Sequence, residues 1–183
     1  MKKLLLFVAA LLLSSCILVD DLGGYWEKGV TDPALVGVWA PADNPSSSAD
    51  KRIEITLGVD ELQANSLNEK ERAQKEYKPI FFKILKVPPY TFFMMRDDKD
   101  GKKGVLVRYK AGDDVLHLYV MRSAEAAKYL TTRFPEEMKG VTITPTIHVL
   151  NERALKLLVA IPDEPAYWQD AGKWVRLPMH LTQ

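Results

Sequence analysis

Hydrophobic and polar residues alternate with a period of two along several stretches of the chain. The alternation is cleanest in residues 52–57, where Ile53, Ile55 and Leu57 share one face and polar residues occupy the other. This pattern predicts a strand with one buried face. Seven further segments are rich in aromatic and β-branched residues and are also predicted to be strands. They are residues 35–39, 80–87, 90–95, 104–110, 115–121, 142–150 and 173–177.

Short turns and two helical segments separate the predicted strands. Residues 97–103 and 111–114 have the charged and glycine residues of tight hairpin turns. Helices are predicted over residues 123–132 and 152–161, which have good helix formers and, in the second, an apolar stripe. Ser123 and Asn151 are the expected N-caps.

Residues 58–78 are the polar exception, and they predict either a short exposed helix or an extended hairpin loop. Taken with the strands, they indicate a mainly β protein with two or three helices (α+β). We expect its antiparallel meander to form a barrel or a half-barrel.

The chain begins with a short apolar segment that follows positive charge. Lys2 and Lys3 precede the ten apolar residues 4–13. Ten residues of helix are about 15 Å long, whereas the hydrocarbon core of a bilayer is about 30 Å thick. The segment is therefore expected to be a signal peptide rather than a membrane-spanning helix.

Leu13, Ser14, Ser15 and Cys16 resemble the lipobox of bacterial lipoproteins, in which a leucine and two small residues precede the lipidated cysteine. The resemblance implies cleavage before Cys16 and attachment of a diacylglycerol and an N-acyl chain, such as palmitate, to that residue. No other cofactor is expected. The alternatives are an ordinary secretory signal with a chance cysteine, and an N-terminal core helix.

Lipid on Cys16 makes the membrane the first expected partner. Two or three acyl chains hold a protein firmly, because one chain alone binds a membrane only reversibly. The protein is therefore expected to be lipid-anchored in the cell envelope. Residue 17 is Ile rather than Asp, and by resemblance to sorted lipoproteins this implies the outer membrane, facing the periplasm, in a Gram-negative host. In a Gram-positive host the anchor implies the outer face of the plasma membrane.

Three regions are expected along the chain. Residues 1–15 form the cleaved signal peptide. Residues 16–31 form the lipidated cysteine and a flexible tether, because they contain glycines and aspartates without periodicity. Tyr25 and Trp26 are expected to dock on the folded domain, or else to lie at the headgroup level. Residues 32–183 form a single β-rich globular domain.

The charge balance and the cysteine count exclude several classes of function. The 183 residues contain 25 Lys and Arg and 24 Asp and Glu. This balance lacks the basic excess that drives binding to nucleic acid, which is not an expected partner. Cys16 is the only cysteine, so that after lipidation no thiol remains for a disulfide, a metal site or catalysis.

The sequence contains few candidates for catalysis. The three histidines, His117, His148 and His180, are far apart, and no metal site is expected. The sequence has no nucleophile elbow, phosphate loop or dinucleotide fingerprint. His117 is the candidate catalytic residue, although its place inside a predicted strand favours a hydrogen-bonded residue of the core or rim.

Gly37-Val38-Trp39, early in the predicted meander, resembles the Gly-x-Trp motif of lipocalins and the wider calycin family. In that family the tryptophan closes one end of a β-barrel, and an arginine from near the C-terminus packs on its ring. Arg176 stands in the corresponding position, so the resemblance implies a lipocalin-like barrel closed by Trp39 and Arg176. The lipocalin Thr-Asp-Tyr motif is missing. The order of segments is also similar to that of small bacterial lipoproteins of unassigned function.

Two hypotheses about function follow, from different classes. The first is a binding or structural module for an apolar small molecule or an envelope protein, with Phe82, Phe92, Met94 and Tyr119 lining a site at the barrel mouth. The second is a periplasmic hydrolase that uses carboxylates and His117. A cleft with His117 within hydrogen-bond reach of an acidic residue would favour the enzyme, whereas a packed His117 would favour the binding module.

Overall fold

The computed structural model describes residues 17–19, 22–45, 51–75, 77–96, 104–139 and 152–178. The signal peptide, the lipobox and Cys16 lie outside these residues. So do the turn predicted at 97–103, the strand predicted at 142–150, and the N-cap Asn151, together with His148 and His180. The predictions for these segments stay predictions.

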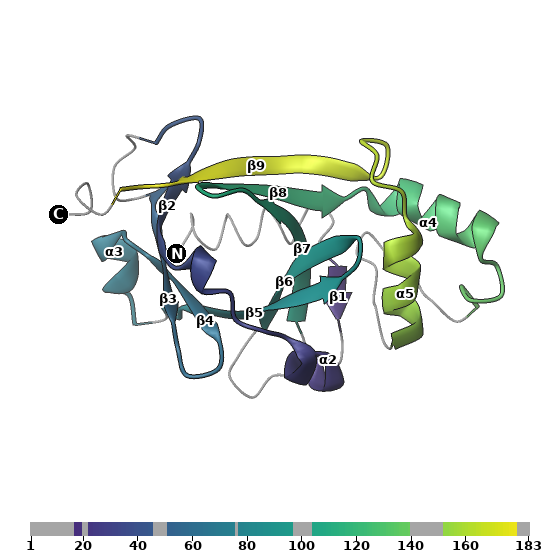
Figure 1. Ribbon diagram of the computed structural model, residues 1–183, viewed down its shortest axis with the longest axis horizontal. Helices are drawn as coiled ribbons and strands as arrows, with labels where there is room; N and C mark the ends of the chain where they lie inside the picture. The colour runs from purple at the N-terminus through teal and green to yellow at the C-terminus, as the bar shows by residue number, and fades with distance from the viewer. Residues whose placement is uncertain are drawn as a thin grey trace.

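Nine strands in the described part of the chain form one antiparallel sheet, drawn in Figure 1. They are β1 (Ile17–Val19), β2 (Gly37–Pro41), β3 (Ile53–Leu57), β4 (Leu62–Ser66), β5 (Ile80–Val87), β6 (Tyr90–Arg96), β7 (Gly104–Ala111), β8 (Val115–Met121) and β9 (Trp168–Arg176). From β2 to β8 each strand pairs with the next. β9 pairs with both β8 and β2, so that the eight strands β2 to β9 close into a barrel. The short strand β1 lies outside this ring, alongside the first half of β7.

The closed barrel confirms the predicted fold class, a mainly β protein whose antiparallel meander forms a lipocalin-like barrel. The described residues contain four α-helices rather than two or three. They are α2 (Gly23–Lys28), α3 (Glu69–Arg72), α4 (Ser123–Arg133) and α5 (Glu152–Ala160), and a 3-10 turn, η1 (Pro33–Leu35), precedes β2. Ser123 is the first residue of α4 and Arg122 is its N-cap, which corrects the predicted cap. In the part of the chain that the structure describes, no helix is long and apolar enough to cross a membrane.

Large apolar side chains fill the interior of the barrel. They are Leu35, Trp39, Ile55, Leu62, Phe82, Ile84, Tyr109, Leu116, Leu118 and Trp174. Phe93 stacks on Tyr109 with the ring centroids 4.0 Å apart, and meets Phe82 edge to face at 5.3 Å. Burial raises the pKa of Tyr109, and the negative charge of Asp32 adds to the shift. Each fully buried side chain of this size contributes about 1.5–3 kcal/mol to stability.

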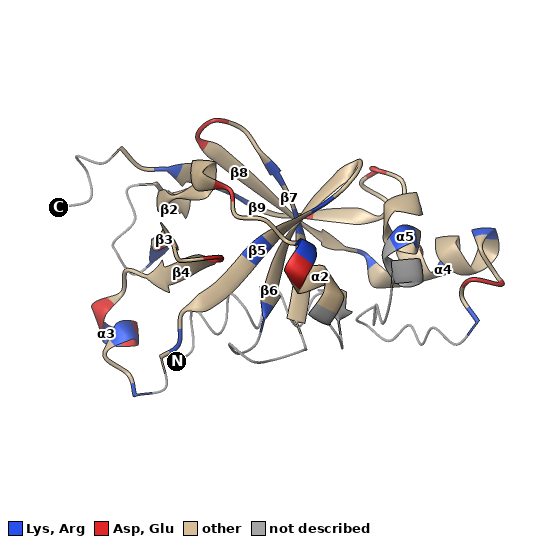
Figure 2. Cartoon of the chain, turned by 60° about the horizontal axis from the view of Figure 1, so that its bottom comes forward, with Lys and Arg blue, Asp and Glu red and all other residues tan. Residues whose placement is uncertain are grey.

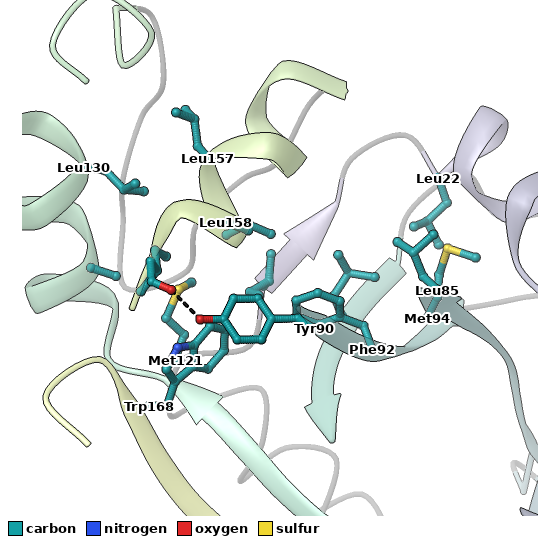
Figure 3. Packing of buried hydrophobic residues seen from close by; sticks show 14 of the residues in the cluster. Leu22, Leu85, Tyr90, Phe92, Met94, Met121, Leu130, Leu157, Leu158 and Trp168 are labelled. Atoms are coloured by element: carbon teal, nitrogen blue, oxygen red, sulfur yellow. Dashed lines mark hydrogen bonds between the residues drawn. The ribbon is translucent and has the colours of Figure 1, made fainter. Parts of the chain in front are cut away.

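The outer face of the wall formed by β5, β6 and β7 is buried as well. Successive side chains of a strand point to opposite faces, so Phe93 of β6 points inward while Phe92 and Met94 point outward. The outward residues pack in a second hydrophobic cluster with β1, α2, α4 and α5. Figure 3 shows two parts of this cluster: Leu22, just before α2, lies beside Leu85 and Met94 of the barrel, and Tyr90 lies nearer to Leu158, Met121 and Trp168. The hydroxyl of Tyr90 donates to the carbonyl oxygen of Ile161, at the end of α5.

The described part of residues 16–31 does not form the flexible tether predicted from its composition. Ile17 pairs with Leu106 of β7 and is 2% exposed. The helix α2 packs on the barrel, and its Trp26 is buried with the guanidinium of Arg96 4.2 Å from the centre of its ring. The prediction that Tyr25 and Trp26 dock on the folded domain is thus confirmed, and these contacts replace the expected tether.

Two other segments differ from their predictions. Residues 58–78 include α3, the short exposed helix that was one of the two predictions, but also strand β4. β4 is held by pairing with β3 and β5 rather than by an apolar pattern of its own. The last strand begins at Trp168, well before the predicted 173. Its first half pairs with β8.

Gly104 marks a close approach between the outer layer and the barrel wall. A Cβ atom at this position would lie 2.0 Å from Cδ1 of Leu22 and 2.3 Å from the carbonyl oxygen of Met95. We predict that Gly104→Ala lowers the free energy of unfolding by about 1–3 kcal/mol, because the backbone must move to admit the methyl group. Urea unfolding monitored by circular dichroism measures the change.

Gly24→Ala is the matched control, because a Cβ atom there would meet no atom within 4 Å. Alanine also favours the helical conformation of α2, so this variant is expected to be as stable as the wild type or slightly more stable. If Gly104→Ala and Gly24→Ala changed the free energy of unfolding equally, the close packing of Leu22 on β7 would be contradicted.

Candidate functional site

Trp39 and Arg176 are in contact where β2 pairs with β9, beside η1. Trp39 is fully buried, and its Nε1 donates to the carbonyl oxygen of Leu35 at 2.9 Å. Arg176 pairs with Trp39 across β2 and β9, and its Cζ lies 4.8 Å from the centre of the indole ring. The guanidinium also donates to the carbonyl oxygens of Val36 and Ala34. The predicted contact between Trp39 and Arg176 is therefore present, and it joins β2, β9 and η1.

A cavity of about 710 Å³ lies where β2 ends and β3 begins. We call it the mouth cavity. It is lined by residues 41–43, 51–53 and 170–174, together with Ser66 and Glu71. Ile53, Ala171 and Trp174 also belong to the interior cluster, so the apolar floor of the cavity continues into the barrel core.

Charged side chains of both signs surround the mouth cavity. The lining includes the basic residues Lys51, Arg52 and Lys173 and the acidic residues Asp43, Glu71 and Asp170. The carboxylate of Glu71 accepts a hydrogen bond from the hydroxyl of Ser66 at 2.9 Å. Elsewhere too both signs lie side by side, as they do on α2 and α3 in Figure 2. The cavity thus has an apolar floor and a charged rim.

His117 lies on the outer face of β8, beside the wall of the mouth cavity. Its Nε2 is 2.7 Å from Oδ2 of Asp170, and its Nδ1 is 2.9 Å from the hydroxyl of Tyr119. The hydrogen bond with His117, followed by one from the backbone N–H of Gly172, lowers the pKa of Asp170 from its ordinary value. His117 is not among the residues that line the mouth cavity, although Asp170 is.

A buried guanidinium lies next to this group, on the outer face of β7. Arg108 is 1% exposed, and its Cζ is 4.3 Å from the ring centre of Tyr90, 4.5 Å from that of Trp168 and 5.0 Å from that of Tyr119. Its Nη2 is 2.6 Å from Oδ1 of Asp163. The hydrogen bond with Arg108 lowers the pKa of Asp163, and Lys110, 2.9 Å away, adds to the shift. An arginine that fills its own aromatic cage is a structural element of the wall.

The four residues predicted to line a ligand site do not lie together. Phe82 points into the barrel interior, whereas Phe92 and Met94 are buried in the outer cluster. Tyr119 lies on the outer face against His117 and Arg108. None of the four is among the residues that line the mouth cavity, which corrects the predicted site.

Little in the sequence predicts the two contacts that the structure shows on the outer face, between His117 and Asp170 and between Arg108 and Asp163. Asp170 and His117 are separated by 53 residues, and a bulge in β9 brings them together. Asp163 follows α5 in a short turn and has no characteristic spacing from Arg108. The one signal for Arg108 is its position as a lone charge in the apolar run 104–109, which indicates a cation with a buried partner.

The described residues contain no group of three or more His, Cys, Asp or Glu side chains that could hold a metal ion. Comparisons with protein-family models, curated proteins and solved structures found no match for this chain. The functional interpretation therefore depends on the geometry of the barrel and its mouth cavity.

Replacement of Asp163 should destabilise the folded protein, because Arg108 is buried beside it. We predict that Asp163→Asn lowers the free energy of unfolding by about 1–3 kcal/mol at neutral pH, because a buried cation loses its counter-charge. Since the pKa of Asp163 is lowered in the folded protein, its contribution is present above the unfolded value of about 3.9 and is lost as the pH falls through the folded pKa. The stability difference between wild type and variant should therefore shrink in acid, which urea unfolding at several pH values measures.

Glu136→Gln removes a carboxylate from an exposed pair with Lys139 and serves as the control. It should leave stability nearly unchanged, because exposed pairs contribute little. A pH-independent difference for Asp163→Asn would show that the carboxylate charge is not what stabilises Arg108.

Proposed function

We propose that this protein is a lipid-anchored protein of the cell envelope that binds a small amphipathic molecule in the mouth cavity. The observation that carries the proposal is the cavity of about 710 Å³ with its apolar floor and charged rim. Small-molecule sites in proteins are typically concave, about 300–1,000 Å³ in volume, and mostly apolar with a few polar groups. The mouth cavity has this size and an apolar floor, and its rim is more highly charged, as suits an amphipathic ligand.

The filled interior supports a site at the mouth rather than in the barrel centre. Phe82, Phe93 and Tyr109 occupy the middle of the barrel in contact with one another. A ligand would therefore lie on Ile53 and Trp174, with its apolar part toward the floor. Its polar group would meet the rim, where Lys51 and Lys173 are the exposed cations.

The proposed anchor is adjacent to the barrel in sequence. Ile17, the residue after Cys16, pairs with Leu106 of β7, and consecutive Cα atoms are about 3.8 Å apart. Acyl chains on Cys16 would thus begin next to the barrel wall, with no long spacer. Such an anchor would hold the barrel close to the membrane surface, at the outer membrane facing the periplasm in a Gram-negative host.

A hydrolase is the second candidate, and the contact between His117 and Asp170 is the observation that favours it. A histidine oriented by a carboxylate is the arrangement of a general base. Its other ring nitrogen, however, contacts the hydroxyl of Tyr119, and the ring lies outside the residues that line the mouth cavity. The binding function therefore has the stronger support.

A side chain that fills the mouth cavity should abolish binding there. We predict that Ala42→Phe weakens binding of the neutral dye N-phenyl-1-naphthylamine at least about tenfold, because the ring occupies the apolar floor. Ala42 lines the cavity, and its backbone N–H donates to the carbonyl oxygen of Lys173. Dye fluorescence measures the affinity.

Ala111→Phe is the matched control, because Ala111 is exposed at the end of β7 and does not line the cavity. It should bind the dye as the wild type does. If the wild-type protein does not bind the dye, the small-molecule site is contradicted and docking of an envelope protein becomes the better form of the binding hypothesis.

The lipid anchor is tested by removing the acceptor. We predict that Cys16→Ser releases the protein from membranes on washing with alkaline carbonate, because each buried methylene of the acyl chains contributes about 0.8 kcal/mol to attachment. Ser15→Ala keeps a small residue before the cysteine and should stay membrane-bound. Retention, after the same wash, of a Cys16→Ser variant whose signal peptide has been cleaved would contradict the anchor.

A further inference from the structure

A bulge in β9 shapes part of the wall of the mouth cavity. Leu118 of β8 pairs with Gly172, whereas the next residue, Tyr119, pairs with Asp170, so that Ala171 is an extra residue in β9. Gly172 has a φ of 119°, a conformation that glycine adopts at little cost. Bulges of this kind bend a strand and redirect its side chains. Asp170, Ala171 and Gly172 all line the cavity.

The carboxylate of Asp170 ties this bulge to β8. Its Oδ1 accepts a hydrogen bond from the backbone N–H of Gly172 at 2.7 Å, inside the bulge. Its Oδ2 lies 2.7 Å from Nε2 of His117. One side chain therefore connects the backbone of the cavity wall to a histidine on the outer face of the barrel. The lowered pKa of Asp170 is consistent with a carboxylate that stays ionised in this arrangement.

We infer that His117 is a positioning residue for the mouth cavity, holding the bulge of β9 through Asp170, and that its protonation makes binding in the cavity pH-dependent. This inference rests on the proposed function, because it concerns the same cavity. His117 touches no ligand in this scheme. It acts on the cavity through the two hydrogen bonds of Asp170.

The hydrogen-bond partners determine how protonation acts. An ionised carboxylate only accepts, so the neutral ring carries its proton on Nε2, which donates to Asp170, while Nδ1 accepts from the hydroxyl of Tyr119. In the protonated ring both nitrogens donate, and the bond to Asp170 joins opposite charges. The bond is charge-assisted in either state because its acceptor is ionised, and the positive ring adds the attraction between opposite charges. Protonation therefore holds the bulge more firmly without a change of partners.

The other charges around His117 do not replace Asp170. Lys110 of β7 and Lys173 of β9 are its cross-strand neighbours. Lys110 is paired with Asp163 at 2.9 Å, and both lysines oppose a positive charge on the ring. Asp170 is thus the acidic partner of His117 on β9. The direction expected is tighter binding at lower pH, because a preorganised wall lowers the cost of binding.

The test separates the positioning contact from the binding function. In the purified protein, the backbone amide of Gly172 is followed by ¹H–¹⁵N NMR from about pH 5 to 8, where histidine side chains titrate. Binding of N-phenyl-1-naphthylamine, which stays neutral in this range, is measured by fluorescence over the same pH values. His117→Gln removes the titrating ring, and Lys110→Gln, which changes a neighbouring charge without touching Asp170, is the control.

We expect the Gly172 amide to titrate in the wild type and in Lys110→Gln but not in His117→Gln. The dye should bind about threefold more tightly at the acid end of the range in the first two proteins, and with no pH dependence in the third. A Gly172 amide that does not titrate, or that titrates equally in His117→Gln, overturns the inference. So does pH-independent dye binding when the amide titrates. If the dye does not bind at all, the proposed function fails, and the inference about the cavity fails with it even if the amide titrates.

Discussion

Burial of both faces of the wall formed by β5, β6 and β7 is the constraint on which the rest of the structure depends. The inward residues, such as Phe93, fill the barrel, and the outward residues Phe92 and Met94 need a second layer to exclude water. The elements β1, α2, α4 and α5 supply that layer. The same burial explains the surroundings of Arg108 on the outer face. A buried guanidinium needs compensating contacts, and here aromatic rings surround it and Asp163 lies beside it.

The candidate site lies at the mouth cavity because most other parts of the barrel are covered or filled by side chains. The helices cover the outer wall of β5 to β7, aromatic rings fill the barrel centre, and Arg176 packs on Trp39 next to η1. β2 ends at Pro41, which pairs with Trp174, whereas β9 extends beyond this pair to Trp168. The mismatch in strand length and the bulge at Ala171 leave the charged and apolar groups of the cavity accessible.

The strands could be predicted from the sequence wherever a local pattern determines them, as in 80–87 and 115–121, and the contact between Trp39 and Arg176 followed from a family resemblance. Other elements depend on partners distant in sequence. The strand β4 contains one large apolar residue, Leu62, and forms because β3 and β5 flank it. The patterns of β5 and β6 do not tell which face points inward, so the sequence predicts one site for Phe82, Phe92 and Met94, although they lie in two clusters. The pairing of His117 with Asp170 depends on a bulge that no local spacing encodes.

We propose that packing fills the barrel and its covered wall and leaves the mouth cavity as the place where a small molecule binds. The most direct test is to map the amide chemical shifts of the purified protein that change when N-phenyl-1-naphthylamine is added. The changes should cluster in residues 42–43, 51–53 and 170–174, which line the cavity. Changes concentrated instead at Phe93 and Tyr109 inside the barrel, or at Leu130 and Leu158 beneath the helices, would contradict it.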